Sequence, residues 1–377
     1  MPDWASPAED RPRVAIVHDW LTGMRGGEKV LESIGRIFPG APILTLVHVR
    51  GSVSAAIEAH PIRAASSLRY LPARLYRHYL PLFPAAIETF DLDDVDLVIS
   101  SSHCAAKSVV RSGRARHLCY CHSPMRYVWD QYDHYFGPER IGRFRAAALR
   151  PVLASLARWD RGTAHRVDRF LANSQHVAGR IARYYNRHSD VLYPPVDTEH
   201  FTPGPNPAQS YFLVVSALVP YKRVDIAIDA AARLGAPLKI VGTGPDRGRL
   251  AAMAGPSVEF LGAVDPDRLR DAYRGAQALL LPAEEDFGIA PVEAMACGRP
   301  VIALGRGGAT ETVVPGETGW LVDRQHPAAF AEAMADVPGA CLDPGLARRQ
   351  AERFSVDRFE RAFRERVAEM LAAPSAC

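Results

Sequence analysis

Two glutamates, Glu285 and Glu293, stand eight residues apart in the stretch EEDFGIAPVE, where an apolar run gives way to a helical pattern. A helix that follows a strand presents its free backbone N–H groups and its positive dipole end to an anion. Gly288 and Ile289 would begin this helix, with Glu293 about one turn inside it. If all eight steps from Glu285 were helical, the two carboxylates would be about 12 Å apart. That separation suits a sugar bound at one carboxylate and a ribose at the other, with a diphosphate between them. The alternative is two unrelated surface glutamates.

Two further features of the first half are candidates for chemistry. His122 ends the strand-like run HLCYCH, and TGMRGGEKVL follows a strand and opens a helix. Gly26 and Gly27 in the second segment would let the backbone approach a phosphate or an acceptor closely. The segment is neither a G-x-G-x-x-G motif nor a P-loop, because no Ser or Thr follows its lysine. A hydrogen-bonded strand-end histidine and a plain turn remain the alternatives.

Metal ligands are not predicted. The Asp-x-Asp pattern in DLDDVD, residues 91–96, precedes a strand, so we interpret it as a solvated turn. Cys119 and Cys121 have no second cluster at zinc-ligand spacing, and we expect two buried strand cysteines that face one side.

Short apolar runs alternate with helical patterns, which predicts an α/β fold with parallel, doubly wound sheets. The strands expected in the first half are VAIVHDW, ILTLVHV, DLVISS, HLCYCH, RFLANS and VLYPP. Those expected in the second half are YFLVVSAL, LKIVG, VEFLG, ALLLPA, PVIAL and GWLV. The helices expected between them include EKVLESIGRIF, VDIAIDAAARLG, DRLRDAYRGA and PAAFAEAMADV.

The length of 377 residues exceeds that of a usual single core, and TPGPNPAQS, rich in proline and glycine, divides the chain. We expect two Rossmann-like domains, residues 1–195 and residues 208–354, that face one another across a cleft. A final helix, residues 355–373, must pack on one of them, and packing back on the first is one of the two possibilities. One face of this helix carries Val356, Phe359, Phe363, Val367 and Met370.

Basic residues are concentrated in the first half. Residues 1–200 hold 26 Lys and Arg against 20 Asp and Glu, and residues 111–187 hold 15 against 5. Residues 59–87 contain no acid, and RYLPARLYRHYLPLF within them mixes Arg with Tyr, Leu and Phe. Such a face suits an anionic membrane surface or a phosphate-bearing substrate, although a merely solvated face is the alternative. No nucleic-acid partner is expected, because no recognition motif accompanies the charge.

The expected cellular location rests on the length and position of the chain's apolar runs. No apolar signal region opens the chain, and no run approaches the roughly 18 apolar residues that span a bilayer. We therefore expect a cytoplasmic protein that is peripheral on the cytoplasmic face of the inner membrane.

The Glu285-x7-Glu293 spacing with its internal Phe287-Gly288-Ile289 resembles the signature of family 4 retaining glycosyltransferases of GT-B fold. Other segments similar to this family's motifs occur in the expected order. SALVPYKRVD resembles the phosphate-binding segment of the donor domain, and VLYPPVDTEHF resembles the interdomain segment. IVGTGP, FLGAV and GGATETVVPGETGWLV resemble later donor-domain motifs. The resemblance covers nearly the whole chain, more weakly before residue 95.

The resemblance implies a role for each matching residue of the donor domain. Glu285 would contact the transferred sugar, and Glu293 would hold the ribose. Phe287, Gly288 and Ile289 would offer backbone N–H groups to the sugar and the phosphates.

The same resemblance implies that Lys222 and Arg223 neutralise the diphosphate. Ala217 stands where the family usually has an arginine beside the phosphates. This departure leaves Lys222 and Arg223 with more of the charge compensation.

In the first domain, His122 matches the family's active-site histidine near the donor sugar. Gly26 and Gly27 would lie with the donor-binding residues. We assign the following segment HSPMRYVWDQYDHY, rich in Arg and Tyr, to the acceptor side, with Arg126 and Tyr127 as its candidates.

The sequence therefore predicts a metal-independent GT-B enzyme without a cofactor, whose co-substrate is a nucleotide diphosphate sugar. It would move a hexose, with retention, to a lipid-linked or oligosaccharide acceptor in cell-surface polysaccharide or lipopolysaccharide synthesis. GDP-mannose is the first donor suggested, because HSPMRYVWD and PYKRVD resemble bacterial polysaccharide mannosyltransferases. A nucleotide-sugar epimerase of the same fold and a non-catalytic nucleotide-sugar-binding partner of another transferase remain the alternatives.

Overall fold

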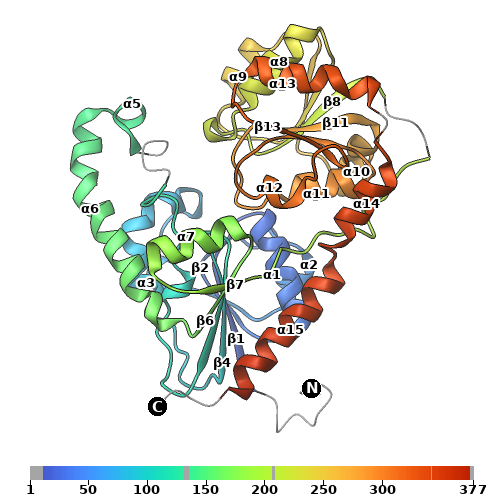
Figure 1. Ribbon diagram of the computed structural model, residues 1–377. Coiled ribbons are helices and arrows are strands. Elements are labelled where there is room, and N and C mark those ends of the chain that lie inside the picture. The colour runs from blue at the N-terminus through green and yellow to red at the C-terminus, as the bar shows by residue number, and fades with distance from the viewer. Residues whose placement is uncertain (1–11, 131–135, 206–208, 341, 374–377) are drawn as a thin grey trace. The chain divides into compact units, whose positions relative to one another are not determined.

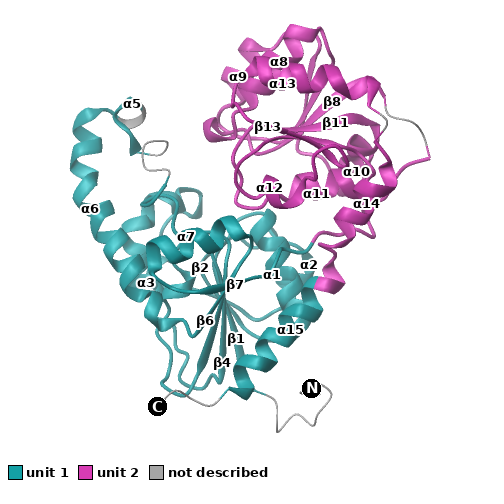
Figure 2. Cartoon of the chain, in the orientation of Figure 1, with its two compact units in different colours: residues 1–195, 359–377 teal, residues 196–358 magenta. Residues whose placement is uncertain are grey.

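The chain divides into two compact units (Figure 2). The computed structural model describes residues 12–130, 136–205, 209–340 and 342–373. Unit 1 comprises residues 1–195 and 359–377, and unit 2 comprises residues 196–358. The first segment of unit 1 therefore ends at Pro195, and the end of the chain returns to this unit.

Unit 1 contains a parallel sheet with seven strands among the described residues, in the order β3-β2-β1-β4-β5-β6-β7. The strands are β1 (Val14–Leu21), β2 (Ile43–His48), β3 (Ile62–Ala64), β4 (Leu97–Ser102), β5 (Arg116–Cys121), β6 (Arg169–Ala172) and β7 (Ser189–Val191). The α-helices are α1 (Gly26–Ile37), α2 (Ala55–Glu58), α3 (Phe83–Ile87), α5 (Pro138–Ile141), α6 (Arg143–Gly162), α7 (Gln175–Tyr185) and, from Phe359 onward, α15 (Val356–Ala372). The strand order reverses between β1 and β4, which makes the sheet doubly wound.

Two strands of unit 1 differ from the sequence prediction. The strand expected at VLYPP is shifted toward the N-terminus and forms β7, because Pro194 and Pro195 have no N–H to donate to a ladder. The edge strand β3 was not predicted, since its three residues are half-buried or exposed and carry no apolar run.

One face of the unit 1 sheet is covered by α1 and α15, which pack together (Figure 1). The Phe38 and Phe363 rings meet edge to face, with their centroids 6.5 Å apart. On the predicted apolar face of α15, Val356 is half-buried. The other four residues of this face are buried in the core: Phe359, Phe363, Val367 and Met370. The end of the chain is thus part of the core of unit 1.

Unit 2 contains a parallel sheet with six strands among the described residues, in the order β10-β9-β8-β11-β12-β13. The strands are β8 (Tyr211–Val215), β9 (Leu238–Val241), β10 (Val258–Gly262), β11 (Ala276–Leu281), β12 (Val301–Leu304) and β13 (Gly319–Val322). The α-helices are α8 (Val224–Leu234), α9 (Arg247–Met253), α10 (Pro266–Gly275), α11 (Ile289–Ala296), α12 (Ala309–Thr312), α13 (Pro327–Asp336) and α14 (Pro344–Glu352).

The core of unit 2 lies between this sheet and the helices α8 and α13, which lie side by side in Figure 1. Central strands such as β11 and β12 are almost continuously buried, as expected where helices cover both faces of a parallel sheet. The prediction of two parallel, doubly wound α/β sheets is confirmed.

A buried carboxylate fixes the loop that follows β4. Asp19 has no exposed surface, and its two oxygens accept hydrogen bonds from four consecutive backbone N–H groups, those of residues 103–106, at 2.6–2.9 Å. The His103 Nδ1 also lies 3.1 Å from Asp19 Oδ2. One side chain thereby ties the carboxyl end of β1 to the loop after its neighbour β4.

We predict that Asp19→Asn loosens this loop, because an amide nitrogen would face two N–H donors that need an acceptor. An unsatisfied buried donor costs about 1–3 kcal/mol, so the unfolding midpoint in urea should fall. Hydrogen exchange of the amides of residues 103–106 measures the local effect directly. Asp94→Asn is the control, since Asp94 is 93% exposed and pairs with Arg13 at the surface. Unchanged exchange in Asp19→Asn would contradict the prediction.

Candidate active site

The candidate donor residues of unit 2 lie where its strand order reverses. Lys222 ends the 3₁₀ helix η6 (Pro220–Lys222) after β8, and Glu285 lies in the loop between β11 and α11. β8 and β11 are neighbours in the sheet, so both residues follow the carboxyl ends of adjacent strands. Ligands of open α/β sheets bind at this edge.

Lys222 and Glu285 form an ion pair through Nζ and Oε1. Their side chains are only 17% and 13% exposed, so each charge compensates the other in a partly dry environment. The two residues to which the sequence assigned the phosphate and the sugar are therefore brought together by the fold. A diphosphate that binds Lys222 would compete with the Glu285 carboxylate for its ammonium group.

The backbone around Glu285 is held by the glycines after β12. Gly308 N–H donates to the Glu285 carbonyl at 2.8 Å, and Gly307 forms a bridge with Glu285. A Cβ on Gly308 would lie 2.3 Å from the Cα of Phe287, so only glycine permits this approach. The Phe287 ring is buried and meets Phe354 edge to face at 5.4 Å. The turn that starts α11 is thus packed on both sides.

The start of α11 partly corrects the spacing argument. Gly288 has a φ of 88° and caps the helix, which begins at Ile289. Only the second half of the Glu285–Glu293 interval is helical, so the assumption of eight helical steps was wrong. The N-terminal position of Gly288 and Ile289 agrees with the prediction.

Glu293 lies on α11 and is buried, with a protein partner. The hydroxyl group of Tyr273 donates to Glu293 Oε2 at 2.7 Å. Burial and the adjacent Glu293 carboxylate raise the pKa of Tyr273 well above its ordinary value, so this hydroxyl stays a donor. The hydrogen bond fixes the carboxylate, and the ribose contact stays a prediction.

Arg223 is engaged differently from Lys222. Its φ is 50°, and its guanidinium lies 3.1 Å from Asp225 Oδ2 and 3.5 Å from Gln325 Oε1. Gln325 in turn donates to the carbonyl of Pro282 at the end of β11. Arg223 therefore supports the loops around the edge of the sheet, whereas Ala217 is exposed beside them.

In unit 1, His122 follows β5 and is held by Ser101 on the neighbouring strand β4. Its Nε2 lies 2.8 Å from Ser101 Oγ, and the same oxygen lies 3.1 Å from His18 Nδ1 on β1. The Asn173 side chain donates to the His122 carbonyl at 3.0 Å. The histidine is thus fixed at the carboxyl edge of the sheet, next to the reversal of strand order.

The electrostatic surroundings keep His122 neutral. Burial lowers the pKa of His122 well below its ordinary value, and His103, His18 and Arg126 lower it further. Burial also lowers the pKa of His103, although the nearby Asp19 opposes this shift. A neutral imidazole can accept a hydrogen bond from a hydroxyl group.

The other candidates of unit 1 occupy the same edge. Gly26 and Gly27 begin α1, and a Cβ on Gly27 would lie 3.7 Å from His122 Nε2. Arg126 and Tyr127 follow β5, and Tyr127 packs partly buried against the core of unit 1. Residues 131–135 of the segment assigned to the acceptor lie outside the described residues.

The sequence prediction missed His18, Ser101, Glu28, Asp19 and His103. Four of them stand at or just beyond the carboxyl ends of the apolar runs VAIV and LVIS. A polar residue at the carboxyl end of a predicted strand could have identified these four as candidate site residues.

Two segments that resemble metal motifs have the local structures expected from the sequence. DLDDVD is a solvated turn before β4, and Cys119 and Cys121 are buried together in the core under α7. Within the described ranges, no group of three or more His, Cys, Asp or Glu is arranged to hold a metal ion.

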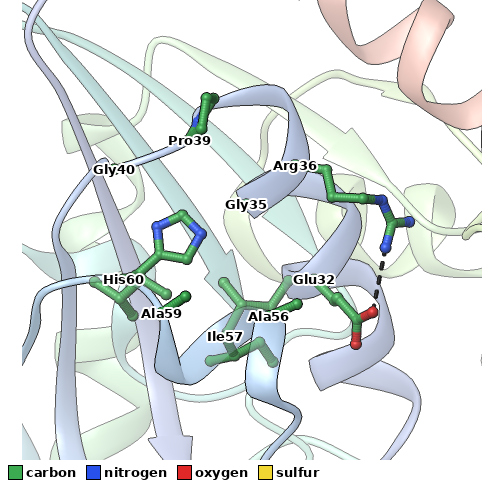
Figure 3. A pocket seen from close by; sticks show the side chains of 11 residues that line it. Glu32, Gly35, Arg36, Pro39, Gly40, Ala56, Ile57, Ala59 and His60 are labelled. Carbon is green, nitrogen blue, oxygen red and sulfur yellow. Dashed lines mark hydrogen bonds and ion pairs between the residues drawn. The ribbon is translucent and has the colours of Figure 1, made fainter.

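A pocket of about 230 Å³ lies elsewhere in unit 1, between α1, α2 and the start of β2 (Figure 3). The His60 ring faces Gly35, where a Cβ would come within 2.8 Å of its Nε2, and Arg36 pairs with Glu32 at 3.2 Å. Ile43 begins β2 at the amino edge of the sheet, so this pocket is separate from the residues around His122.

Two family models match the chain. The model described as "Glycosyltransferase Family 4" matches residues 26–200, and the model described as "Glycosyl transferases group 1" matches residues 209–337. The two matches fall on the two sheets of the structure.

The chain is also similar to curated proteins named D-inositol 3-phosphate glycosyltransferase. It is 35% identical to the one from Acidothermus cellulolyticus over 48% of this chain and 46% of that protein. It is 33% identical to the one from Geodermatophilus obscurus over 55% of this chain and 54% of that protein. The chain spans about half the length of the curated relatives it matches.

Solved structures share the architecture. The Anabaena protein HepE in complex with UDP and glucose has a TM-score of 0.70 at 19% identity, over 95% of this chain and all of that chain. Sucrose-phosphate synthase from Thermosynechococcus elongatus has a TM-score of 0.74 at 18% identity, over 97% of this chain and all of that chain. The family models, the two parallel sheets and these likenesses agree: the chain belongs to the family 4 glycosyltransferases and has their GT-B fold.

Proposed function

We propose that this protein transfers a hexose from a nucleotide diphosphate sugar to a hydroxyl group of a lipid-linked or glycan acceptor, with retention and without a metal. The observation that carries the proposal is the Lys222–Glu285 ion pair beside the start of α11, at the reversal of strand order in unit 2. A cation, a carboxylate and a helix N-terminus at one place match a diphosphate joined to a sugar.

Binding of the donor would exchange the partners of this pair. The phosphate oxygens take Lys222, and Glu285 becomes available to accept hydrogen bonds from sugar hydroxyls. The N-terminus of α11 adds its dipole and backbone donors to the diphosphate. As negative charge builds on the leaving group, these fixed groups stabilise it without a metal ion.

Retention is best served by attack from the front face. The bond from C1 of the sugar to the phosphate oxygen breaks, and a bond from C1 to the acceptor oxygen forms on the same face. The proton of the acceptor hydroxyl passes to the leaving phosphate. His122 orients a hydroxyl group of the sugar, and no carboxylate of the protein is assigned as a nucleophile.

The donor remains to be identified among nucleotide sugars. GDP-mannose is the first to test, because two segments resemble bacterial polysaccharide mannosyltransferases. UDP-glucose is the second, because HepE was solved with UDP-glucose. The relatives named D-inositol 3-phosphate glycosyltransferase suggest a phosphorylated polyol as a further acceptor beside the lipid-linked and glycan acceptors.

Two alternatives are distinguished by the products. An epimerase converts a donor sugar to its epimer without any acceptor, and a silent binding partner binds nucleotide but neither transfers nor hydrolyses the sugar. A thermal-shift panel of GDP, UDP, ADP and dTDP selects the base first, because a ligand that binds only the folded state raises stability.

We predict that Glu285→Gln lowers the turnover of sugar transfer by about 10²-fold or more, as for the loss of a transition-state contact. Nucleoside diphosphate affinity should stay the same or rise, because Lys222 is released from its ion pair. Transfer with the selected donor in the presence of EDTA measures turnover, and calorimetry measures affinity.

The neighbouring Glu284→Gln is the control for this variant, since Glu284 is exposed and has no assigned role. Near-normal turnover in Glu285→Gln would remove the assigned role. Loss of transfer in EDTA with rescue by Mg²⁺ or Mn²⁺ would contradict the metal-independent mechanism.

The two adjacent cations should differ in effect. We predict that Lys222→Ala lowers kcat/KM by about 10²–10³ and weakens nucleoside diphosphate binding, because the diphosphate loses a charge-assisted partner in a partly dry site. Arg223→Ala should cost less than a factor of about 10, since Asp225 already holds its guanidinium. If Arg223 proves dominant and Lys222 dispensable, the phosphate cation has been assigned to the wrong residue.

We also propose that unit 1 binds the anionic cytoplasmic face of a membrane. Among the described residues, no helix has both the length and the apolar character needed to cross a bilayer. The 3₁₀ helix η3 (Ala73–Leu82) exposes Arg74, Leu75 and Arg77, and α6 exposes Phe144, which is 94% accessible. Exposed basic and large apolar side chains together suit an interfacial surface.

We predict that the protein sediments with anionic liposomes and that high salt releases it, because each basic residue contributes about 1 kcal/mol, screened by ions. The double variant Arg74→Glu/Arg77→Glu should lose most of this binding. Arg233→Glu, at an exposed position of α8 in unit 2, is the control; it makes the same charge change as each of the two substitutions in the double variant. Equal binding to neutral liposomes, or none to either, would reject the membrane proposal.

A further inference from the structure

A row of polar side chains lies behind His122 on neighbouring elements of unit 1. Ser101 Oγ lies 2.8 Å from His122 Nε2 on one side and 3.1 Å from His18 Nδ1 on the other. The second nitrogen of His18, Nε2, lies 3.9 Å from Oε1 of Glu28 on α1. The four side chains connect α1 through β1 and β4 to the end of β5.

This row is shielded from water except at its His122 end. His18 and Ser101 have no exposed surface, and Glu28 is 3% exposed. The first turn of α1 covers the two imidazoles, since a Cβ on Gly27 would lie 3.7 Å from both rings. Within the part of the chain that the structure describes, His18 Nε2 has no hydrogen-bond partner at normal distance. The group that faces it is the Glu28 carboxylate.

The Glu28 carboxyl is ionised at neutral pH. Burial opposes its charge, but the interactions with His18, the nearby His103 and a backbone N–H together outweigh burial, so the pKa of Glu28 is lowered. The backbone N–H of Arg25 also donates to its other oxygen at 3.0 Å. A buried negative charge beside His18 Nε2 favours a proton on that nitrogen over a lone pair.

Proton counting then determines the rest of the row. In its neutral form, His18 has one N–H, so a proton on Nε2 leaves a lone pair at Nδ1. The single hydroxyl proton of Ser101 is donated to that lone pair. Ser101 Oγ can then only accept from His122, which places the His122 proton on Nε2 and leaves Nδ1 without one.

We propose that Glu28, His18 and Ser101 are positioning residues that hold the proton of His122 on Nε2, so that Nδ1 offers its lone pair to a substrate hydroxyl. The identity of this hydroxyl as that of a sugar or an acceptor rests on the proposed function. The position of the proton does not, because it follows from groups within unit 1. His122 therefore acts as an acceptor of a hydrogen bond and not as a donor.

The protein contains a matched serine–histidine pair with the opposite arrangement. Ser100 Oγ lies 2.8 Å from His117 Nε2, and His117 Nδ1 lies 3.1 Å from the carbonyl of Arg166. A carbonyl only accepts, so His117 carries its proton on Nδ1 and accepts from Ser100. Burial lowers the pKa of His117 to about 3, which keeps the ring neutral. The two histidines should therefore be opposite tautomers.

Nitrogen NMR of the full-length protein labelled with ¹⁵N-histidine tests the inference without any substrate. At mildly alkaline pH, we expect His122 as the Nε2–H tautomer and His117 as the Nδ1–H tautomer, with signals assigned by His122→Gln and His117→Gln. Ser101→Ala and Glu28→Gln should each shift His122 toward the Nδ1–H tautomer, whereas Ser100→Ala should leave it unchanged. A wild-type His122 with its proton on Nδ1, or a His122 tautomer unaffected by both variants, would overturn the proposal.

Kinetics with the donor selected above adds the functional readout. Ser101→Ala should lower kcat by about 10-fold with little change in the KM for the donor, the size expected for one misoriented hydrogen bond. Glu28→Gln preserves the side-chain shape and gives the same test if Ser101→Ala does not fold. If the expected tautomers are found but no nucleotide sugar supports transfer, the proposed function fails while the positioning role is upheld.

Discussion

Parallel pairing of the strands places every candidate residue of this protein. Parallel neighbours require a crossover connection, so all carboxyl ends of one sheet lie at the same edge. The order reverses between β1 and β4 in unit 1 and between β8 and β11 in unit 2, where successive crossovers diverge to opposite sides. His18 and Ser101 form the last register pair between β1 and β4, and Lys222 and Glu285 follow β8 and β11. The candidate residues of each unit are therefore brought together at the carboxyl edge of its sheet.

Charges near these edges are compensated by specific partners, because a charge that leaves water is costly unless it is paired. Lys222 and Glu285 compensate one another, and Asp19 is surrounded by four amide donors. These two solutions differ in consequence. The amides are part of the backbone and cannot be exchanged, so Asp19 is structural. An ion pair between two side chains can be opened by a ligand that offers each of them another partner.

Much of the local structure could be predicted from the sequence. The runs VAIVHDW and ALLLPA became β1 and β11, because short, mostly apolar runs suit strands that are covered on both faces. The helix expected from Glu28 begins at Gly26 instead, since Glu28 reaches back to the backbone N–H of Arg25 and caps the first turn. The expected strand at VLYPP moved, because its prolines cannot pair. These differences all lie at element ends, where local and tertiary hydrogen bonds compete.

The sequence by itself determined the α/β alternation, the apolar face of the last helix and the motif around Glu285. Only the tertiary structure decided which polar side chains meet. Lys222 and Glu285 are 63 residues apart, and His18 and Ser101 are 83 residues apart. The apolar pattern of a single segment indicates which of its residues are buried. A hydrogen bond or an ion pair between side chains of two segments also requires that these segments pair in the correct register. That register exists only once the strands have paired, so the row behind His122 and the partner of Lys222 could not be found from the sequence.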